Sequence, residues 1–366
     1  MALSFSAREF ALGFAAGCIV TIALGAFVAF ALFRPKDIYG LGHWKLNVRT
    51  PFRSMWMNLG FCEAKANPNH RIPHRTTEDG RRIDHFDVAT RALLEKIVHA
   101  AGLGVENQPA RAASKTKHSV AVLDVGFGCG DQTIALAELI QASSRPQFRY
   151  VGLTLNAEQL QAAQERLSGA LAVEGGRENA IGLSKGAVKL FQADAAKPES
   201  WSSVVHASVD SLADEAFSER WLMALDCLYH FSPSRKSIFK LAAKTLDANV
   251  MAFDLILNEK APMWQIIAVR LLGFILSCPL YTFLTAEQYR NQLIECGYDE
   301  AQIEIRDISD HVFGGLSGYL RKQEVALSRY GISLAGYNLT GKVFAWFDRT
   351  RVVKAAIVIG RTKRNA

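Results

Sequence analysis

The sequence predicts an α/β fold in which a mostly parallel sheet carries helices on both faces. Three observations predict it: apolar runs of strand length alternate with helical patterns from residue 119 onward, two further strand-like runs close the chain, and a glycine-rich turn joins the first run to a helix. Ligands of such open sheets bind beyond the carboxyl ends of the strands. The polar residues that follow each run are therefore the candidates for a functional site.

The first strand and its turn lie in residues 122–131, VLDVGFGCGD. Glycines at 126, 128 and 130 remove Cβ atoms from the turn, so a ligand can lie against bare backbone at the helix N-terminus, where free N–H groups point outward. The dinucleotide fingerprint G-x-G-x-x-G needs its third glycine at 131, where this chain has Asp131. A carboxylate there suits a positively charged ligand better than a pyrophosphate. The alternative is a tight strand–helix turn that binds nothing.

With Asp124 before it, this turn resembles motif I of the class I S-adenosylmethionine (SAM) methyltransferases, D-x-G-x-G-x-G. The resemblance implies a Rossmann-like seven-stranded methyltransferase sheet with helices on both faces and an antiparallel last strand. It also implies SAM as the cofactor. The cofactor-binding residues that it implies in this turn are Asp124, Gly126, Phe127, Gly128 and Gly130.

The next two strand ends carry further cofactor candidates. Residues 151–159, VGLTLNAEQ, resemble the V-G-L-T-L-S-x-x-Q segment of the cyclopropane fatty acid synthase branch. Many methyltransferases have an acid here for the ribose hydroxyls, but this chain offers Thr154, Leu155 and Gln159. The strand at 188–193 is followed by Asp194 and Ala195, and an acid there accepts from the adenine amino group in the family. The alternative for Asp194 is an exposed turn acid.

The catalytic candidates follow the fourth strand. Residues 224–230, ALDCLYH, resemble the strand exit of sterol and related lipid methyltransferases, where a histidine lies four residues after an acid. His230 is the leading candidate for a general base, because a neutral imidazole can take a proton near pH 7; Asp226 and Tyr229 are the others. The alternative for His230 is a structural role. Cyclopropane synthases place Glu directly before this histidine, and Tyr229 stands there instead, which favours simple methylation.

Residues 10–33 contain no charged residue and exceed the ~20 residues that cross a bilayer core. They predict a single-pass anchor rather than a signal peptide, whose apolar region has only ~7–15 residues. More basic residues follow the run than precede it, which predicts a cytosolic catalytic domain, consistent with the endoplasmic reticulum. The expected domains are a membrane anchor at 1–36, a cap segment with a helix at 37–118, and a SAM-binding domain at 119–366.

Two other stretches bear on the substrate. Residues 55–61, MWMNLGF, resemble an M-N-L-G-Y-W-like segment that covers the cofactor in some small-molecule methyltransferases, or else form an aromatic cluster on the core. Residues 260–284 are almost continuously apolar and predict a lid over the substrate mouth. A buried helix pair is the alternative. A second membrane span is disfavoured, because Arg270 would cost ~2.5–3.5 kcal/mol and the later strands would lie across the membrane from their sheet.

Composition limits the remaining function classes. The net charge is +7, yet no stripe of Arg and Lys interleaved with aromatics indicates nucleic acid binding. The six cysteines include no C-x-x-C pair, and no metal site is expected. The predicted function is a membrane-anchored SAM-dependent methyltransferase acting on a lipid or other apolar small molecule. The alternatives are an NAD-type oxidoreductase, which Asp131 disfavours, and a catalytically inactive scaffold with the methyltransferase fold.

Overall fold

The computed structural model describes residues 7–33, 52, 54–64, 75–76, 83, 85–104, 119–143, 147–171 and 186–363. The chain divides into two compact units. One consists of Met1–Arg49 with Leu327–Ile332, and the other of Thr50–Ala326 with Ser333–Ala366. The second unit contains the sheet and all the candidate site residues.

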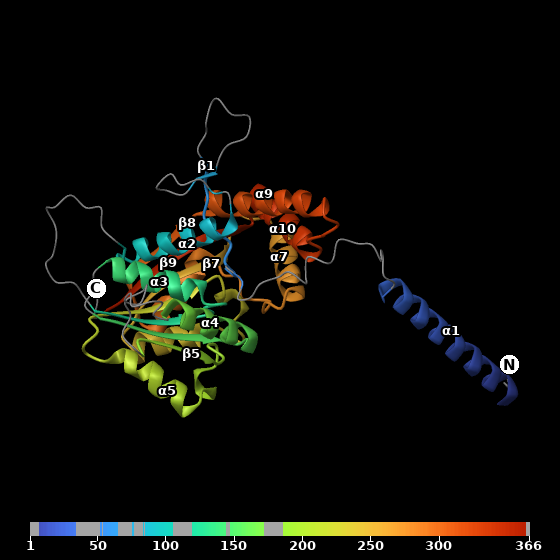
Figure 1. Ribbon diagram of the computed structural model, residues 1–366, viewed down its shortest axis with the longest axis horizontal. Helices are drawn as coiled ribbons and strands as arrows, with labels where there is room; N and C mark the ends of the chain where they lie inside the picture. The colour runs from blue at the N-terminus through green and yellow to red at the C-terminus, as the bar shows by residue number, and fades with distance from the viewer. Residues whose placement is uncertain are drawn as a thin grey trace, which may run out of the picture. The chain divides into compact units, whose positions relative to one another are not determined.

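In the first unit, Ala7–Phe33 form a single helix, α1 (Figure 1). A span needs ~20 consecutive apolar residues, and the side chains of α1 are described over residues 12–25. Within the part of the chain that the structure describes, no helix combines the length and apolar character needed to cross a bilayer. The membrane anchor predicted over residues 10–33, and the single-pass arrangement built on it, are therefore not supported.

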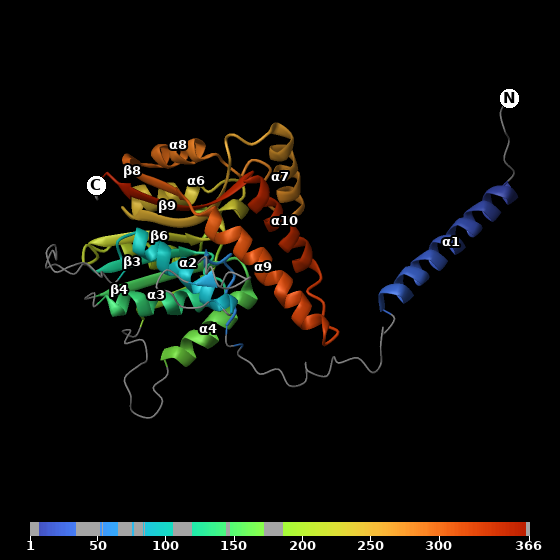
Figure 2. The same cartoon turned by 90° about the horizontal axis from the view of Figure 1, so that it is seen from above.

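The second unit is built on a seven-stranded sheet in the order β5-β4-β3-β6-β7-β9-β8 (Figures 1 and 2). Strands β3 to β7 run parallel, and β9 lies antiparallel between β7 and β8. The antiparallel last strand confirms the predicted sheet. The strands are β3 Val120–Val125, β4 Phe148–Thr154, β5 Val188–Gln192, β6 Glu219–Leu225, β7 Asn249–Leu257, β8 Tyr298–Asp307 and β9 Val353–Thr362. A separate antiparallel pair joins β1 Glu63–Ala64 to β2 Arg75–Thr76.

Helices cover both faces of this sheet, so β3 and β7 are buried at every position and their sequences are apolar without alternation. One apolar core joins the sheet to α2 Phe86–Ala100, α3 Asp131–Ala142, α7 Met263–Ile275, α9 Ser309–Ser328 and α10 Gly336–Thr350. The other core joins it to α5 Ser203–Asp210, α6 Lys236–Lys240 and α8 Ala286–Cys296. Helix α4, Ala157–Leu171, connects β4 to β5.

Two element boundaries decide where the catalytic candidates lie. Helix α6 begins at Lys236, where the Ser234 hydroxyl accepts from the Lys236 N–H at 3.1 Å. Strand β6 ends at Leu225 because Asp226 has a φ of 65°, which is incompatible with an extended chain. A short 3₁₀ turn, η4 Leu228–His230, follows. The catalytic candidates therefore lie on a turn after the strand.

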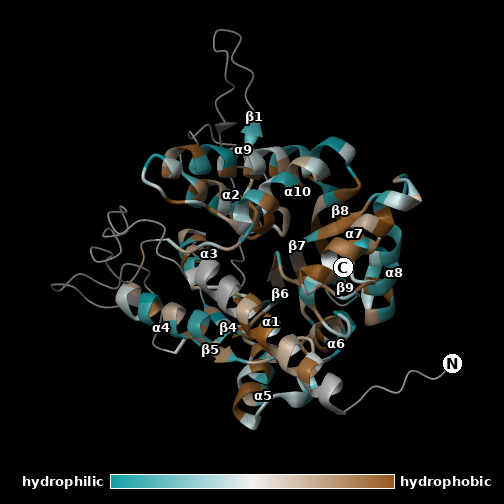
Figure 3. Cartoon of the chain, turned by 90° about the vertical axis from the view of Figure 1, so that its right-hand side faces the viewer, coloured by the Kyte–Doolittle hydropathy of each residue, from teal (hydrophilic) through white to brown (hydrophobic). Residues whose placement is uncertain are grey.

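Helix α7 occupies the stretch predicted as a lid and is largely hydrophobic in sequence (Figure 3), but it is not a buried helix. Val269 and Gly273 are its buried residues. The helix touches the core there, and Phe283 packs so closely that a Cβ on Gly273 would lie 2.6 Å from its ring. The exposed apolar side chains of α7 are Met263, Trp264, Ile267, Leu271, Phe274 and Ile275. The alternative of a buried helix pair is therefore wrong.

Candidate functional site

The glycine-rich turn after β3 has a left-handed backbone at all three glycines, with φ of 80° at Gly126, 66° at Gly128 and 91° at Gly130. A Cβ on Gly126 would lie 2.9 Å from the Cβ of Cys227, and one on Gly130 would lie 3.0 Å from the Cα of Ala163. A Cβ on Gly128 would meet only the side chain of Met57, at 3.6 Å. Gly126 and Gly130 thus make room for the protein's own packing, and Gly128 is the glycine of the turn at which a Cβ would make only an ordinary contact.

Asp124 supports this turn from behind. Its carboxylate is fully buried and accepts from the Gln132 amide at 2.8 and 2.7 Å and from the Tyr150 hydroxyl at 2.6 Å. Burial raises the pKa of Asp124 to about 7, although both hydrogen bonds act in the opposite direction. Gln132, unlike Asp124, lines the cavity beside Gly128. The motif acid therefore orients a residue of the site.

Asp131 is engaged by the protein itself. Its Oδ1 lies 2.5 Å from a guanidinium nitrogen of Arg166 on α4, and its Oδ2 accepts from the Met55 N–H at 3.1 Å. Burial raises the pKa of Asp131, while the positive charge of Arg166 lowers it. The sequence suggested that Asp131 is available to a cationic ligand. In the structure Arg166 compensates the charge of Asp131, so the carboxylate is not left for such a ligand. It instead fixes one end of the segment 55–58.

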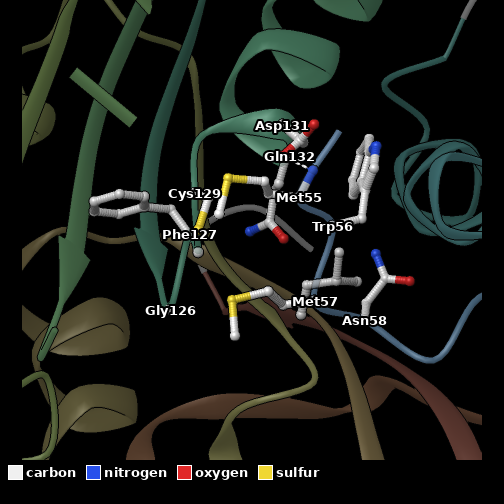
Figure 4. Close-up of a pocket in the computed structure, with 11 residues that line it drawn as sticks. Met55, Trp56, Met57, Asn58, Gly126, Phe127, Cys129, Asp131 and Gln132 are labelled. Atoms are coloured by element: carbon white, nitrogen blue, oxygen red, sulfur yellow. Dashed lines mark hydrogen bonds between the residues drawn. The ribbon is translucent and has the colours of Figure 1, made fainter. Parts of the chain in front are cut away.

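The segment 55–58 lies across from the glycine turn (Figure 4). The Met57 sulfur accepts from the Gln159 amide at 3.2 Å, and the Asn58 amide donates to the Thr90 carbonyl at 3.2 Å. A cavity of about 20 Å³, which we call the turn cavity, remains between segment and turn. That volume holds about one water molecule. The turn cavity is lined by residues 55–58, 126–129, 131, 132 and 225.

The second and third strand ends lie beside this turn, because β3, β4 and β5 are consecutive in the sheet. The Thr154 hydroxyl donates to the Gln159 side chain at 2.7 Å, and Asn156 caps α4 by accepting from the Gln159 N–H at 2.8 Å, as expected. Leu155 is exposed. The structure thus brings Thr154 and Gln159 together, and Gln159 reaches Met57 over Gly128.

Asp194 follows β5 at the same edge. Its Oδ1 accepts from the Ala196 N–H at 2.9 Å, and its Oδ2 lies 3.5 Å from the Lys197 ammonium. These contacts are those of a turn acid, the alternative that the sequence left open. The adjacent Ala195 is buried. No hydrogen bond among the described residues joins Asp194 to the glycine turn, to Thr154 or to Gln159.

Asp226 and Tyr229 form a pair after β6. The Tyr229 hydroxyl donates to Asp226 Oδ1 at 2.9 Å, and the Leu59 N–H also donates to this carboxylate. Burial raises the pKa of Asp226 to about 7, and the nearby charge of Asp254 acts in the same direction. A non-glycine residue with a left-handed backbone at a strand end is a strained conformation of the kind that clusters at functional sites. The Asp226 carboxylate can therefore take a proton near neutral pH.

His230 contacts the turn that follows α7. Its Nδ1 lies 3.4 Å from the Cys278 sulfur, and the Ser277 backbone also accepts a hydrogen bond from the ring. Burial lowers the pKa of His230, so the ring is neutral at pH 7. Burial also raises the pKa of Cys278 to about 11, which keeps the thiol protonated. The imidazole is thus held by two contacts of its own.

Sequence reasoning missed the residues that hold the site in place. Tyr150 on β4 donates to Asp124, and Arg166 on α4 pairs with Asp131. Arg235 forms a buried ion pair with Asp254 and donates to the Thr282 carbonyl at 2.5 Å. Tyr150 lies on the strand next to β3, opposite Val122, and this register brings its hydroxyl to Asp124. The two arginines carry no local pattern that distinguishes them from solvent-exposed cations.

Neither a protein-family model nor a curated protein matches the chain. Solved structures do. The mycolic acid cyclopropane synthase CmaA1 complexed with SAH and CTAB is similar with a TM-score of 0.50 and 16% identity, over 76% of this chain and 86% of that one. A putative sarcosine dimethylglycine methyltransferase from Galdieria sulphuraria has a TM-score of 0.50 and 12% identity, over 75% and 86%. At such identities the similarity shows the fold alone, and that fold is the one predicted.

Proposed function

We propose that the chain is a SAM-dependent methyltransferase whose acceptor is a lipid or another apolar small molecule. The observation that carries the proposal is Gly128. It presents a bare, left-handed backbone to a cavity at the carboxyl edge of the central parallel strands. The cyclopropane synthase of the same fold was solved with SAH, which supports the choice of cofactor.

The residues at this edge fit such a cofactor. The turn at Gly128 offers backbone without a Cβ, the Gln132 side chain lines the cavity beside it, and the Gln159 amide donates to the Met57 sulfur across from it. The turn cavity of about 20 Å³ is far below the ~300–1,000 Å³ of a ligand site, so the segment 55–58 must move to admit SAM. By resemblance, Thr154, Leu155 and Gln159 bind the ribose side, and Asp194 and Ala195 bind the adenine.

Among the catalytic candidates, the geometry favours Asp226 over His230. SAM supplies a methyl group on a sulfonium, and a base is needed only where the acceptor loses a proton. The pKa of Asp226, about 7, matches that task, and the Tyr229 hydroxyl fixes its carboxylate. His230 is engaged with Cys278 and Ser277 and positions the turn after α7. Tyr229, in place of the glutamate of cyclopropane synthases, favours methylation of the acceptor.

The apolar acceptor is supported by the surface of α7. This helix exposes six large apolar side chains and only one basic residue, the half-buried Arg270, lies within it. A helix with that surface suits a lid over an apolar substrate, the role expected for residues 260–284. The cyclopropane synthase was solved with CTAB, an amphiphile with a long alkyl chain, which supports a lipid-like acceptor.

Calorimetry with S-adenosylhomocysteine and NADH tests the cofactor. We expect S-adenosylhomocysteine to bind and NADH not to bind. Gly128→Val should weaken S-adenosylhomocysteine binding by at least ~100-fold, because it places a branched side chain on the face that the ligand needs. Gly186→Val is the matched control: Gly186 has a φ of 87° and open space around its Cβ position, so it carries the same strain away from the site.

Unchanged S-adenosylhomocysteine affinity in Gly128→Val, or binding of NADH in its place, would overturn the cofactor assignment. Turnover then separates an enzyme from an inactive scaffold. The full chain is incubated with methyl-labelled SAM and fractionated lipids, and the labelled product is identified by mass. Binding without any transfer to an apolar fraction would contradict the proposed activity.

A further inference from the structure

A second and larger cavity lies on the other side of the segment 55–58. Its volume is about 500 Å³, within the range of small-molecule sites. We call it the helix cavity, because α9 and α10 form most of its wall. It is lined by Trp56, Met57, Asn58, Leu59, Phe86, Leu316, Tyr319, Leu320, Gln323, Leu334, Tyr337, Thr340 and Phe344. All of these residues belong to the same compact unit.

The lining of the helix cavity carries no charged side chain among the described residues. Four of its polar side chains have partners within the protein. The Gln323 amide donates to the Tyr319 hydroxyl at 2.7 Å, the Thr340 hydroxyl donates to the Gly336 carbonyl at 3.2 Å, and Asn58 is bonded to the Thr90 carbonyl. A charged ligand would lose its hydration here without an opposite charge to replace it, which is strongly unfavourable. The cavity therefore selects uncharged, largely apolar molecules.

Three residues line both cavities: Trp56, Met57 and Asn58. They separate the two spaces by the thickness of a single chain. The segment is held at its ends, where the Met55 N–H donates to Asp131 and the Phe61 N–H donates to the Ala89 carbonyl at 2.8 Å. The Met57 side chain between these anchors is 60% exposed. Displacement of Met57 would join the two cavities.

We propose that the helix cavity binds the acceptor as an uncharged apolar molecule, and that Trp56, Met57 and Asn58 form a movable partition between acceptor and donor. This inference rests on the proposed function, since it assigns the acceptor of that same site. The displacement that admits SAM at Gly128 is also the one that lets an acceptor atom approach it. Entry of the donor and occupation of the helix cavity are therefore coupled.

The ligand class is tested by titrating the full chain with the uncharged fluorescent probe N-phenyl-1-naphthylamine, without SAM. Thr340→Trp should weaken probe binding at least tenfold, because Thr340 lines the cavity from an exposed position and the indole fills the space without disturbing the core. Leu339→Trp is the matched control, since Leu339 is exposed on the same helix and lies outside the lining. Equal affinities in wild type and Thr340→Trp, or equal losses in both variants, would overturn the assignment.

The partition is tested by repeating the probe titration with saturating S-adenosylhomocysteine. We expect the probe affinity to change at least threefold, and the probe to change S-adenosylhomocysteine affinity by the same factor, because coupling is reciprocal. Independent binding of the two ligands would overturn the partition. Probe binding that responds to Thr340→Trp in a chain that never binds S-adenosylhomocysteine would instead refute the proposed function and leave the ligand class of the cavity standing.

Discussion

The two sides of the segment 55–58 differ in the charge of their side chains and in their open volume. On the strand-end side, Asp124, Asp131 and Asp226 all have protein partners, and about 20 Å³ is left open. On the helix side, the lining is uncharged and encloses about 500 Å³. In the function we propose, fixed polar groups bind the donor on the strand-end side, and shape and apolarity select the acceptor on the helix side.

The strand-end side is stiff because its charges are buried in pairs. Asp254 is fully buried and Arg235 is 3% exposed, and the arginine also bonds to Thr282 in the turn after α7. A buried charge without its partner is strongly unfavourable, so these contacts keep the polar groups in one geometry. The helix side depends instead on apolar packing of α9 and α10, which tolerates more change of shape.

The sharpest division between chemistry and binding is expected for Asp226→Asn. The variant keeps an acceptor for the Tyr229 hydroxyl but cannot take a proton, so the rate of methyl transfer should fall by ~10²–10⁴-fold for an acceptor that must be deprotonated. The wild-type rate should rise as pH increases through about 7, where the carboxyl of Asp226 loses its proton, and this rise should vanish in the variant. Both effects are measured by steady-state kinetics from about pH 5.5 to about pH 8.5, a range that extends to either side of the pKa of Asp226.

His230→Asn serves as the comparison for Asp226. In the wild type the His230 ring holds the turn after α7, so we expect the rate of methyl transfer in the variant to fall by less than ~10-fold. The pH profile should not change. Probe binding in the helix cavity should remain the same in both variants. A larger rate loss in His230→Asn than in Asp226→Asn would reverse the assignment of the base.

Removing a buried charge tests the stiffness of the strand-end side. Arg235→Met leaves Asp254 buried without a cation and should lower the free energy of unfolding by ~3–5 kcal/mol, as measured by urea denaturation. The neighbouring Lys236→Met breaks an exposed ion pair with Glu295 and should produce no measurable loss. Similar losses in the two variants would show that burial of Arg235 does not stiffen the site.

The packing of α7 against the core is tested at Gly273. A Cβ on Gly273 would lie 2.6 Å from the ring of Phe283, so Gly273→Ala should lower stability by ~1–3 kcal/mol through overpacking. Gly341→Ala on α10 is the control, because its Cβ would be 3.5 Å from Leu320, an ordinary contact, and alanine favours the helix. Thermal unfolding compares the two, and a stable Gly273→Ala would mean that α7 adjusts freely.

A further effect is a pH dependence of stability that arises from Asp124. Its folded pKa of about 7 exceeds the ~3.9 of an unfolded chain, so between these values only the folded state holds the proton. Wild-type stability therefore falls as pH rises from about 4 to about 7 and then levels off. Asp124→Asn does not titrate, and its stability relative to wild type should rise by at most ~1.4 kcal/mol per pH unit. A pH-independent difference in urea unfolding would contradict the raised pKa.

Much of the fold could be predicted, because burial leaves its mark on the sequence. Residues 120–125 and 249–257 are apolar almost without interruption, as expected for central strands covered on both faces, and both are strands. The end of β6 could not be predicted, because nothing in the local sequence shows that Asp226 adopts a φ of 65°. The stretch 260–284 was identified as apolar and forms α7 in the structure, but its composition could not tell an exposed helix from a buried one.

For the site, the motif predicted the glycine-rich turn but not the different role of each residue within it. Spacing marked Gly126, Gly128 and Gly130 alike, although a Cβ would be crowded by protein atoms at Gly126 and Gly130 and not at Gly128. It also marked Asp131 as a free carboxylate, because Arg166 is distant in sequence and becomes its partner only when α4 packs against α3. The segment 55–58 was open to two interpretations; in the structure it contacts Gln159 and Asp131, and Trp56 packs against the core.

By itself, the sequence determined the seven strands, the bare turn after the first parallel strand, and the set of polar residues that follow the strand ends. These features depend on local periodicity and on glycine, whose effects act within a few residues. Only the tertiary structure decided which carboxylates are already paired, where the segment 55–58 lies, and that two unequal cavities share it as a wall. Those outcomes arise from packing between residues far apart in the chain, and no local pattern encodes such contacts.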